Sequence, residues 1–247
     1  MERNKGYQKL KEKTRLRGNS FFFLSTILLV DAFLIGLCIS AALQERNMSV
    51  QAAVQKAESG VRGEKYLALT FDDGPDKDYT KRLLEGLRER GVKASFFLVG
   101  ENIDGNEELL SQMTKDGHLV GTHCLNHVDL TKKSIEESCR DIWATNEKIQ
   151  AVTGRYPEYI RPPYGIWSEE LEECVGMTPV FWDIDPLDWQ VRDAGQIVEH
   201  IRKNVKKHQI ILLHDTYGTS VDAALAVVDV LGREGYVFVT VDELLID

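Results

Sequence analysis

The feature that most constrains the fold is the segment at positions 67–75, LALTFDDGP, in which a short apolar run ends in two adjacent carboxylates. The run has the length and composition of a buried β-strand, and Gly74-Pro75 ends it. Asp72 and Asp73 are therefore expected at the carboxyl end of a strand, where α/β folds bind their ligands. Because consecutive strand side chains point to opposite sides, the two acids should not share one environment, so one could hold a metal and the other a proton. A surface turn is the alternative that this segment alone leaves open.

Short apolar runs alternate with longer amphipathic ones from Lys65 onward. Strands are predicted over Tyr66–Phe71, Ala94–Val99, His118–His123, Tyr159–Arg161, Pro179–Ile184, Ile210–His214 and Tyr236–Val241. Helices are predicted between them, over Tyr79–Arg90, Glu107–Lys115, Ser134–Val152, Ala194–Lys207 and Val221–Glu234. Such alternation is typical of a parallel sheet covered by helices. Because roughly 185 residues are few for a complete eightfold barrel, the predicted fold class is α/β, a distorted (β/α) barrel of about seven strands.

Two histidines four positions apart, His123 and His127, follow the third predicted strand. Two imidazoles and one carboxylate give three protein ligands and leave one coordination position open, which is the arrangement of a catalytic rather than a structural zinc site. A lone histidine is more often a packed or solvated residue. The acid pair at another strand end shifts the interpretation toward a metal site.

Three further strand ends carry candidate site residues. Two prolines follow Arg161 and make a rigid loop that can hold its guanidinium in place, although an exposed arginine on a stiff turn is the simpler interpretation. Acids lie between Trp182 and Trp189, which indicates a sugar-stacking wall, with core packing as the alternative. The sixth predicted strand ends at His214 and Asp215, where the acid could orient the imidazole.

Together these motifs resemble those of the polysaccharide deacetylases of carbohydrate esterase family 4, which share the NodB homology domain. The matching segments are Thr70–Pro75, His123–His127, Arg161–Tyr164, Asp185–Trp189 and Leu212–Asp215. The resemblance covers residues 65–245. It implies a distorted (β/α) barrel that removes acetyl groups from N-acetylated, sometimes O-acetylated, glycans in a metal-dependent reaction.

The resemblance also implies the ligand set and the proton-transfer groups. Asp73, His123 and His127 would hold a divalent metal, usually zinc and sometimes cobalt, nickel or manganese. Asp72 would act as the general base. His214 would protonate the departing amine, which leaves poorly without that proton.

Five more residues would support this chemistry by the same resemblance. Arg161 would orient the general base, and Asp188 would support the general acid. The backbone N–H of Tyr164 would help to hold the oxyanion. Trp189 and Leu212 would form the wall of a small pocket for the acetyl methyl group.

Two positions depart from the family's usual pattern. Cys124 follows His123 where Ser or Thr is usual, and Val128 replaces the proline often found after His127. We expect Cys124 to be a buried, passive thiol. Neither change removes a ligand or a proton-transfer group.

The N-terminal part of the chain predicts a membrane anchor. Residues 1–20 are rich in Lys and Arg, and residues 21–43 form an apolar segment with a single charge, long enough to cross a bilayer. The predicted organisation is a cytoplasmic segment, a single transmembrane anchor or uncleaved signal, a tether over 44–64 and an extracellular catalytic domain over 65–247. A cleaved signal peptide, which would give a secreted protein, is the alternative.

Charge and cysteine content narrow the choice of partners. The net charge of −9 argues against nucleic acid as a ligand. Outside the apolar segment the cysteines are Cys124, Cys139 and Cys174, which permit at most one internal disulfide.

The leading hypothesis is an anchored, metal-dependent enzyme that hydrolyses N-acetyl groups of a cell-envelope glycan. The most direct substrates are the N-acetylglucosamine and N-acetylmuramic acid of peptidoglycan, with acetate and a free amine as products. The alternatives are a xylan-type O-acetyl esterase, a chitin oligosaccharide deacetylase and a glycan-binding protein without turnover. Loss of a ligand or proton-transfer group would have favoured the last, and all of these groups are present.

Overall fold

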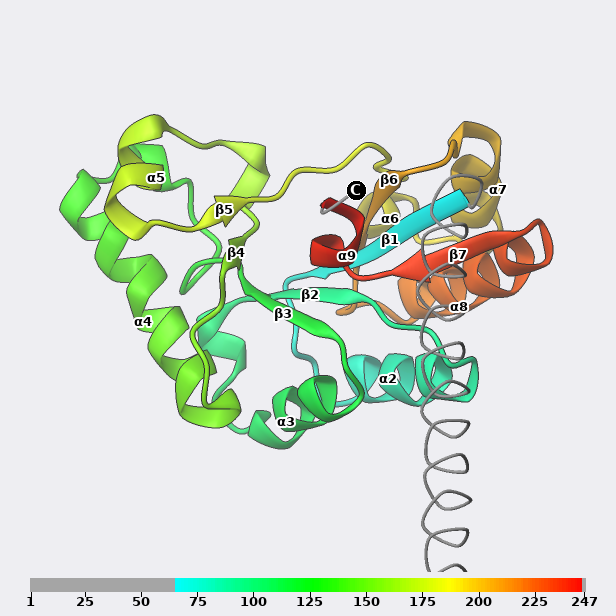
Figure 1. The fold of residues 1–247 in the computed structure, drawn as a ribbon, viewed down its shortest axis with the longest axis horizontal. Coiled ribbons are helices and arrows are strands. Elements are labelled where there is room, and N and C mark those ends of the chain that lie inside the picture. Colours follow the sequence, from blue (N-terminus) through cyan, green and yellow to red (C-terminus); the bar gives the residue numbers. More distant parts are fainter. Residues whose placement is uncertain (1–64, 246–247) are drawn as a thin grey trace, which may run out of the picture. The chain divides into compact units, whose positions relative to one another are not determined.

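The computed structural model describes residues 65–245, and the predicted anchor and tether at positions 1–64 lie outside the described residues. No helix within the described range is long and apolar enough to span a membrane. One parallel sheet contains the seven strands β1 (Lys65–Asp72), β2 (Ser95–Leu98), β3 (Leu119–Thr122), β4 (Tyr159–Ile160), β5 (Thr178–Pro179), β6 (Gln209–His214) and β7 (Tyr236–Val239). Their order is β5-β4-β3-β2-β1-β6, and β7 also pairs with β1 (Figure 1).

The sheet curls into an incomplete barrel. Its path ends at β5 and β6, which do not pair with each other as strands. A single bridge between Ile184 and Ile211 joins the segment after β5 to β6. The predicted α/β class with a parallel sheet is therefore confirmed for the described residues, and the predicted distorted barrel of about seven strands is a curled half-barrel.

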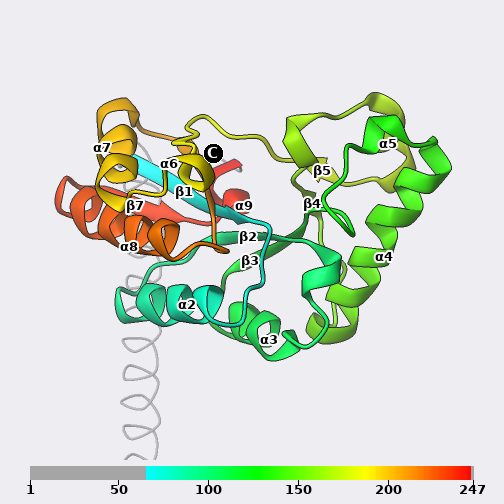
Figure 2. The same cartoon turned by 180° about the vertical axis from the view of Figure 1, so that it is seen from behind.

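The helices of the described residues are α2 (Tyr79–Glu89), α3 (Glu107–Lys115), α4 (Ile135–Thr153), α5 (Glu169–Val175), α6 (Asp188–Val191), α7 (Ala194–Asn204), α8 (Gly218–Arg233) and α9 (Val241–Leu245), with 3₁₀ turns at Gly100–Asn102, Leu130–Lys132 and Pro163–Gly165. The long helices cover the outside of the curled sheet, as the two opposite views show, whereas α9 packs against its inner face (Figures 1 and 2). The five predicted helices correspond to α2, α3, α4, α7 and α8. The short helices α5, α6 and α9 were not predicted, because four to seven residues show too little periodicity.

The predicted fifth strand, Pro179–Ile184, is wrong over most of its length, since β5 covers only Thr178–Pro179. Arg161 explains the difference. Its Nε donates to the carbonyl of Val180 at 2.7 Å, and one terminal nitrogen donates to the carbonyl of Phe181 at 3.4 Å. These carbonyls therefore bond to a side chain instead of to a neighbouring strand.

Alternate residues of β1 face two different cores. Leu67, Leu69 and Phe71 belong to the large cluster formed with the covering helices, and Ala68 belongs to a smaller cluster that includes Val241 of α9. Small side chains on this second, inner face leave room inside the barrel. That space is filled by the guanidinium of a single arginine, described below.

The register brings the candidate residues to one edge of the sheet. Asp72 of β1 pairs with His214 of β6, and Thr122 of β3 pairs with Ile160 of β4. Because all strands are parallel, the chain leaves each of them at the same edge. The segments after β1, β3, β4 and β6 therefore meet there.

Gly121 in β3 permits close packing of the sheet at one point. A Cβ atom at this position would lie 2.6 Å from the Phe97 ring and 2.8 Å from the carbonyl oxygen of Tyr159. Gly121→Ala is therefore expected to lower the free energy of unfolding by about 1–3 kcal/mol. The matched control is Gly232→Ala, on the exposed surface of α8 with nothing within 4 Å of its added Cβ, which should raise stability by up to about 1 kcal/mol. Urea unfolding measures both, and equal midpoints would contradict this account of the packing.

Candidate active site

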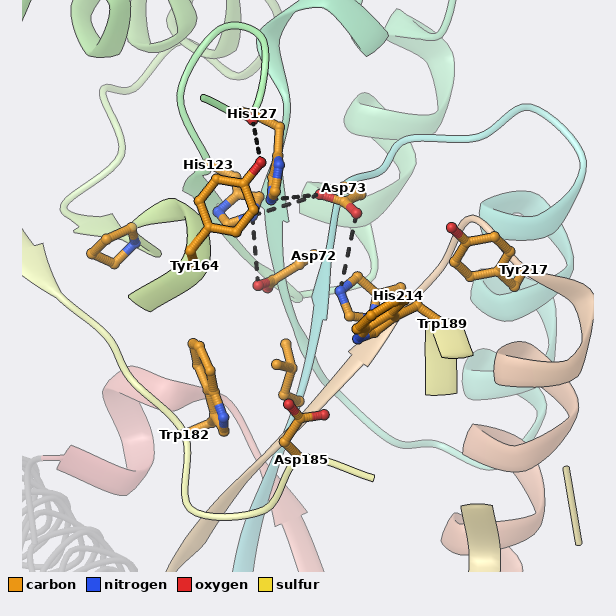
Figure 3. A pocket seen from close by; sticks show the side chains of 12 residues that line it. Asp72, Asp73, His123, His127, Tyr164, Trp182, Asp185, Trp189, His214 and Tyr217 are labelled. Atoms are coloured by element: carbon orange, nitrogen blue, oxygen red, sulfur yellow. Dashed lines mark hydrogen bonds and ion pairs between the residues drawn. The ribbon is translucent and has the colours of Figure 1, made fainter. Parts of the chain in front are cut away.

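A cavity of about 440 Å³ opens at the carboxyl edge of the sheet (Figure 3). Eight of the ten predicted site residues line it: Asp72, Asp73, His123, His127, Tyr164, Trp189, Leu212 and His214. The other two, Arg161 and Asp188, are fully buried behind its wall. The structure therefore brings all ten together, while their individual roles stay predictions.

The expectation that Asp72 and Asp73 occupy separate environments is wrong. Asp73 has a left-handed backbone with φ of 75°, which interrupts the alternation of side chains at the end of β1. The side-chain amide of Asn102 donates to the Asp73 carbonyl at 2.7 Å and helps to fix this turn. As a result, both carboxylates line the same cavity, and both lie within 4 Å of Nε2 of His123.

Asp73, His123 and His127 fit a divalent cation. Asp73 Oδ1 is buried, has no hydrogen-bond partner among the described residues, and lies 3.6 Å from Nε2 of each imidazole. These separations are longer than hydrogen bonds. They are close to the ~3.4 Å between two ligands bound tetrahedrally at ~2.1 Å from one zinc ion.

The tautomer of His123 also suits a metal ligand. Its Nδ1 lies 2.5 Å from the carbonyl oxygen of Arg161, to which it donates its proton. Nε2 is then left with a free lone pair on the side of Asp73. Burial lowers the pKa of His123 to about 3, although the Asp73 charge acts in the other direction, so the ring is neutral.

Asp72 is a buried acid held by a buried arginine. Its two carboxylate oxygens lie 3.3 and 3.4 Å from one terminal nitrogen of Arg161, and its side chain is 4% exposed. Burial raises the pKa of Asp72, although the charges of Arg161 and His214 act in the other direction. A carboxylate with a raised pKa is a better proton acceptor than an ordinary one.

His214 is held by Asp188, the buried acid that begins α6. His214 Nδ1 donates to one carboxylate oxygen of Asp188 at 2.8 Å, and the His214 backbone N–H donates to the other at 2.8 Å. Burial alone would lower the pKa of His214, but this hydrogen bond and the charges of Asp188, Asp72 and Asp73 raise it to about 9. The imidazole is therefore protonated at neutral pH.

The remaining predicted residues form the walls. Tyr164 is 62% exposed, has a left-handed backbone with φ of 59°, and donates its hydroxyl to the carbonyl of His127 at 3.3 Å. Within the described residues, its backbone N–H has no hydrogen-bond acceptor. Trp189 is 47% exposed and Leu212 is buried, so the wall combines an open aromatic face with an apolar floor.

Comparison with known proteins identifies the family to which this chain and its candidate active site belong. A family model described as polysaccharide deacetylase matches residues 59–179. Peptidoglycan-N-acetylmuramic acid deacetylase PdaC of Bacillus subtilis is 36% identical over 192 residues, which cover 78% of this chain and 41% of PdaC. A peptidoglycan-N-acetylglucosamine deacetylase of Bacillus cereus is 36% identical over 190 residues, covering 74% of this chain and 89% of the relative. The chain belongs to the polysaccharide deacetylase family.

Solved structures of the polysaccharide deacetylase family agree with the fold. The structure of PdaC from Bacillus subtilis matches with a TM-score of 0.72 and 37% identity, over 74% of this chain and 90% of that one. The chain spans only about two fifths of the full length of PdaC.

Four residues that line this cavity were not among the predicted site residues: Pro162, Trp182, Asp185 and Tyr217. Pro162 directly follows Arg161, in a segment already singled out above. Trp182 and Asp185 belong to the segment of acids and tryptophans described above, so a signal for them was present. Tyr217 begins the turn into α8, outside every motif, and only the fold places it on the cavity wall (Figure 3).

The two cysteines Cys139 and Cys174 form a disulfide between α4 and α5, with 6.3 Å between their Cα atoms. Cys124 is free and fully buried. Burial raises the pKa of the Cys124 thiol to about 11, so it stays protonated. Within residues 65–245, the predictions of at most one internal disulfide and of a buried thiol at Cys124 are confirmed.

Asp215 is a fully buried acid beside the site. The Thr80 hydroxyl donates to Asp215 Oδ2, whereas Oδ1 has no partner in the described part of the chain. Burial raises the pKa of Asp215 to about 7. The hydrogen bond from Thr80 and the charge of His214 lower this pKa, whereas the charge of Asp73 raises it.

This pKa makes stability depend on pH. In the unfolded chain the carboxyl titrates near its ordinary value of about 3.9. Between that value and 7 the native state binds a proton that the unfolded state lacks, so this stabilisation is complete below about pH 4 and is lost as pH rises through 7. Asp215→Asn should therefore reduce the fall in unfolding free energy from pH 5 to pH 7 by roughly 1 kcal/mol per pH unit. Urea unfolding of metal-free protein at both pH values tests this, and the same pH dependence in variant and wild type would refute it.

Proposed function

We propose that this chain is a divalent-metal-dependent hydrolase that removes N-acetyl groups from peptidoglycan, releasing acetate and leaving a free amine on the sugar. One observation carries the proposal: two proton-transfer groups flank the ligand triad. Asp72 lies 3.8 Å from His123 Nε2, and His214 Nε2 lies 4.0 Å from Asp73 Oδ2. Amide hydrolysis needs both a base for the attacking water and an acid for the amine.

Asp73, His123 and His127 would hold the cation, and zinc suits this set of two imidazoles and one carboxylate, with cobalt, nickel or manganese as substitutes. Once bound, a divalent cation polarises the acetamide carbonyl and acidifies a water molecule. The protein residues then carry the protons. Asp72 takes the proton of the attacking water, while Arg161 holds its carboxylate in place.

Asp188 orients His214, the residue that acts as the general acid. Its contact with Nδ1 leaves the protonated Nε2 of His214 facing the cavity, where it delivers a proton to the leaving nitrogen. The free backbone N–H of Tyr164 donates to the oxygen on which charge develops. Trp189 and Leu212 enclose the acetyl methyl group.

The names of the relatives support peptidoglycan as the substrate, because PdaC of Bacillus subtilis is named for N-acetylmuramic acid and the Bacillus cereus protein for N-acetylglucosamine. We further propose that residues 21–43 hold the catalytic domain at the outer face of the cell membrane. This part of the proposal rests on the sequence, and a protease-accessibility experiment on intact cells would test it.

The test is acetate release by the purified full-length chain loaded with zinc or cobalt. Peptidoglycan, chitin oligomers and acetylated xylan are offered side by side, with Asp72→Asn as the control. Release from peptidoglycan that disappears in the control is expected. Release from xylan alone would identify an esterase instead, release from chitin alone would identify a chitin deacetylase, and no release from any glycan would point to a binding protein.

A further inference from the structure

Arg192 lies at the rim of the cavity, directly after α6. Its Nε donates to the carbonyl of Trp189 at 3.0 Å, and its guanidinium carbon lies 4.5 Å from the centre of the Tyr217 ring. Both Trp189 and Tyr217 line the cavity. A backbone hydrogen bond and a cation–π contact thus hold one positive charge beside the place where the substrate binds.

This charge has no acidic partner among residues 65–245. Other basic side chains near the cavity are neutralised at short range: Arg82 lies 3.2 Å from Asp222, Lys132 lies 3.2 Å from Asp129, and Lys133 lies 2.6 Å from Asp141. Arg192 forms no ion pair within the described residues, and the structure gives its two terminal nitrogens no acceptor there.

The acids closest to Arg192 in the sequence are already engaged. Asp188 is fully buried and accepts a hydrogen bond from His214 Nδ1. The Asp193 side chain accepts from the backbone N–H of Gln196 at 2.9 Å. Both carboxylates are thus held by other bonds, and in the described residues neither forms an ion pair with Arg192. Arg192 is itself exposed to solvent.

A purely structural role would not require an arginine here. Arg192 ends α6 with a left-handed backbone, φ of 50°, a conformation in which glycine or asparagine is more favourable. Its contact with the Trp189 carbonyl uses one of the five N–H donors of the guanidinium. The donors that remain are those of the two terminal nitrogens, which form the planar fork that binds a carboxylate in a bidentate manner.

We propose that Arg192 forms an anion subsite, which binds a carboxylate of the glycan next to the acetamido group that is hydrolysed. The inference rests on the proposed function, because peptidoglycan carries such carboxylates and chitin does not. Two sources share this chemistry, the lactyl ether of muramic acid and the peptide attached to it. The subsite would make this chain selective for an acidic N-acetylated glycan over a neutral one.

The experiment compares four substrates: peptide-free glycan strands of peptidoglycan, the same strands with their lactyl carboxylates converted to methyl esters, intact peptidoglycan and chitin oligomers. Arg192→Gln is compared with wild type and with Arg82→Gln, whose arginine is already paired with Asp222. For Arg192→Gln we expect KM on an acidic substrate to rise about 10- to 100-fold, with kcat nearly unchanged. The esterified strands and chitin should not be affected, and Arg82→Gln should match wild type throughout.

The outcomes separate the sources and the two proposals. If KM of Arg192→Gln rises on peptide-free strands but not on their methyl esters, Arg192 binds the lactyl carboxylate. If KM rises only on intact peptidoglycan, Arg192 binds a carboxylate of the peptide. No change on either acidic substrate, or an equal change on acidic and esterified strands, overturns the subsite. If wild type releases acetate from none of the glycans, the proposed function fails. The affinities of wild type and Arg192→Gln for acidic and esterified strands then decide on the subsite, because they need no turnover.

Discussion

Asp73→Ala is expected to abolish stoichiometric metal binding, whereas Asp72→Asn should retain the metal and lose acetate release by about 10²- to 10⁴-fold. The two acids are adjacent, but only Asp73 places an unpaired carboxylate oxygen 3.6 Å from both imidazoles. Asp72 is instead bound to Arg161. Its neutral amide would leave the ligands in place and could no longer accept a proton.

Metal content per chain after dialysis, measured beside acetate release, checks both expectations. Asp185→Asn is the matched control, because Asp185 also lines the cavity but accepts from the Leu187 backbone N–H at 2.8 Å and lies outside the ligand triad. This control should keep its metal. Equal metal loss in Asp72→Asn and Asp73→Ala would contradict the assignment of the ligand and the base.

Arg161→Met is expected to lower the free energy of unfolding by about 3–5 kcal/mol, because it leaves a buried carboxylate without its counter-charge. Arg161 is fully buried between the rings of Phe97 and Trp182, at 4.6 and 5.4 Å. Its positive charge also lowers the pKa of Asp72. Without it the pKa of the base should rise further, and acetate release at neutral pH should fall.

A double-mutant cycle separates the charge from the packing. If the buried charge causes the loss, Arg161→Met combined with Asp72→Asn should be more stable than Arg161→Met alone. Urea unfolding in the presence of a chelator measures all four proteins. Simple additivity of the two changes would show that Arg161 stabilises the fold by filling space and not by pairing with Asp72.

The ligand triad could be predicted because each of its residues follows a strand, and parallel strands end at one edge of the sheet. The packing of the two prolines and the arginine after β4 could not be predicted in the same way. The residues around Arg161 suggest a stiff, exposed turn, and its burial depends on the small inner-face residues of β1, such as Ala68. The early end of β5 follows from the same buried guanidinium.

Residues outside the periodic segments escaped prediction for a related reason. Tyr217 and Arg192 lie in the connections before α8 and after α6, where neither alternation nor a motif marks a position. Their approach to the cavity is set by how the helices pack on the sheet. The left-handed backbone at Asp73 likewise has no signal in an Asp-Asp-Gly-Pro sequence that would distinguish it from an ordinary turn.

The pairing of β1 gives the two sides of the cavity different dynamics. β1 hydrogen-bonds to β2, β6 and β7. The backbone amide hydrogens of β1, the strand that leads to Asp72 and Asp73, should therefore exchange with solvent only when the whole domain unfolds. Arg161 and Tyr164 instead follow β4, which has two residues and lies next to the end of the sheet. Local opening of the exposed loop around Tyr164 would widen the cavity for a polymer to enter and leave, while the fully buried Arg161 keeps its ion pair with Asp72.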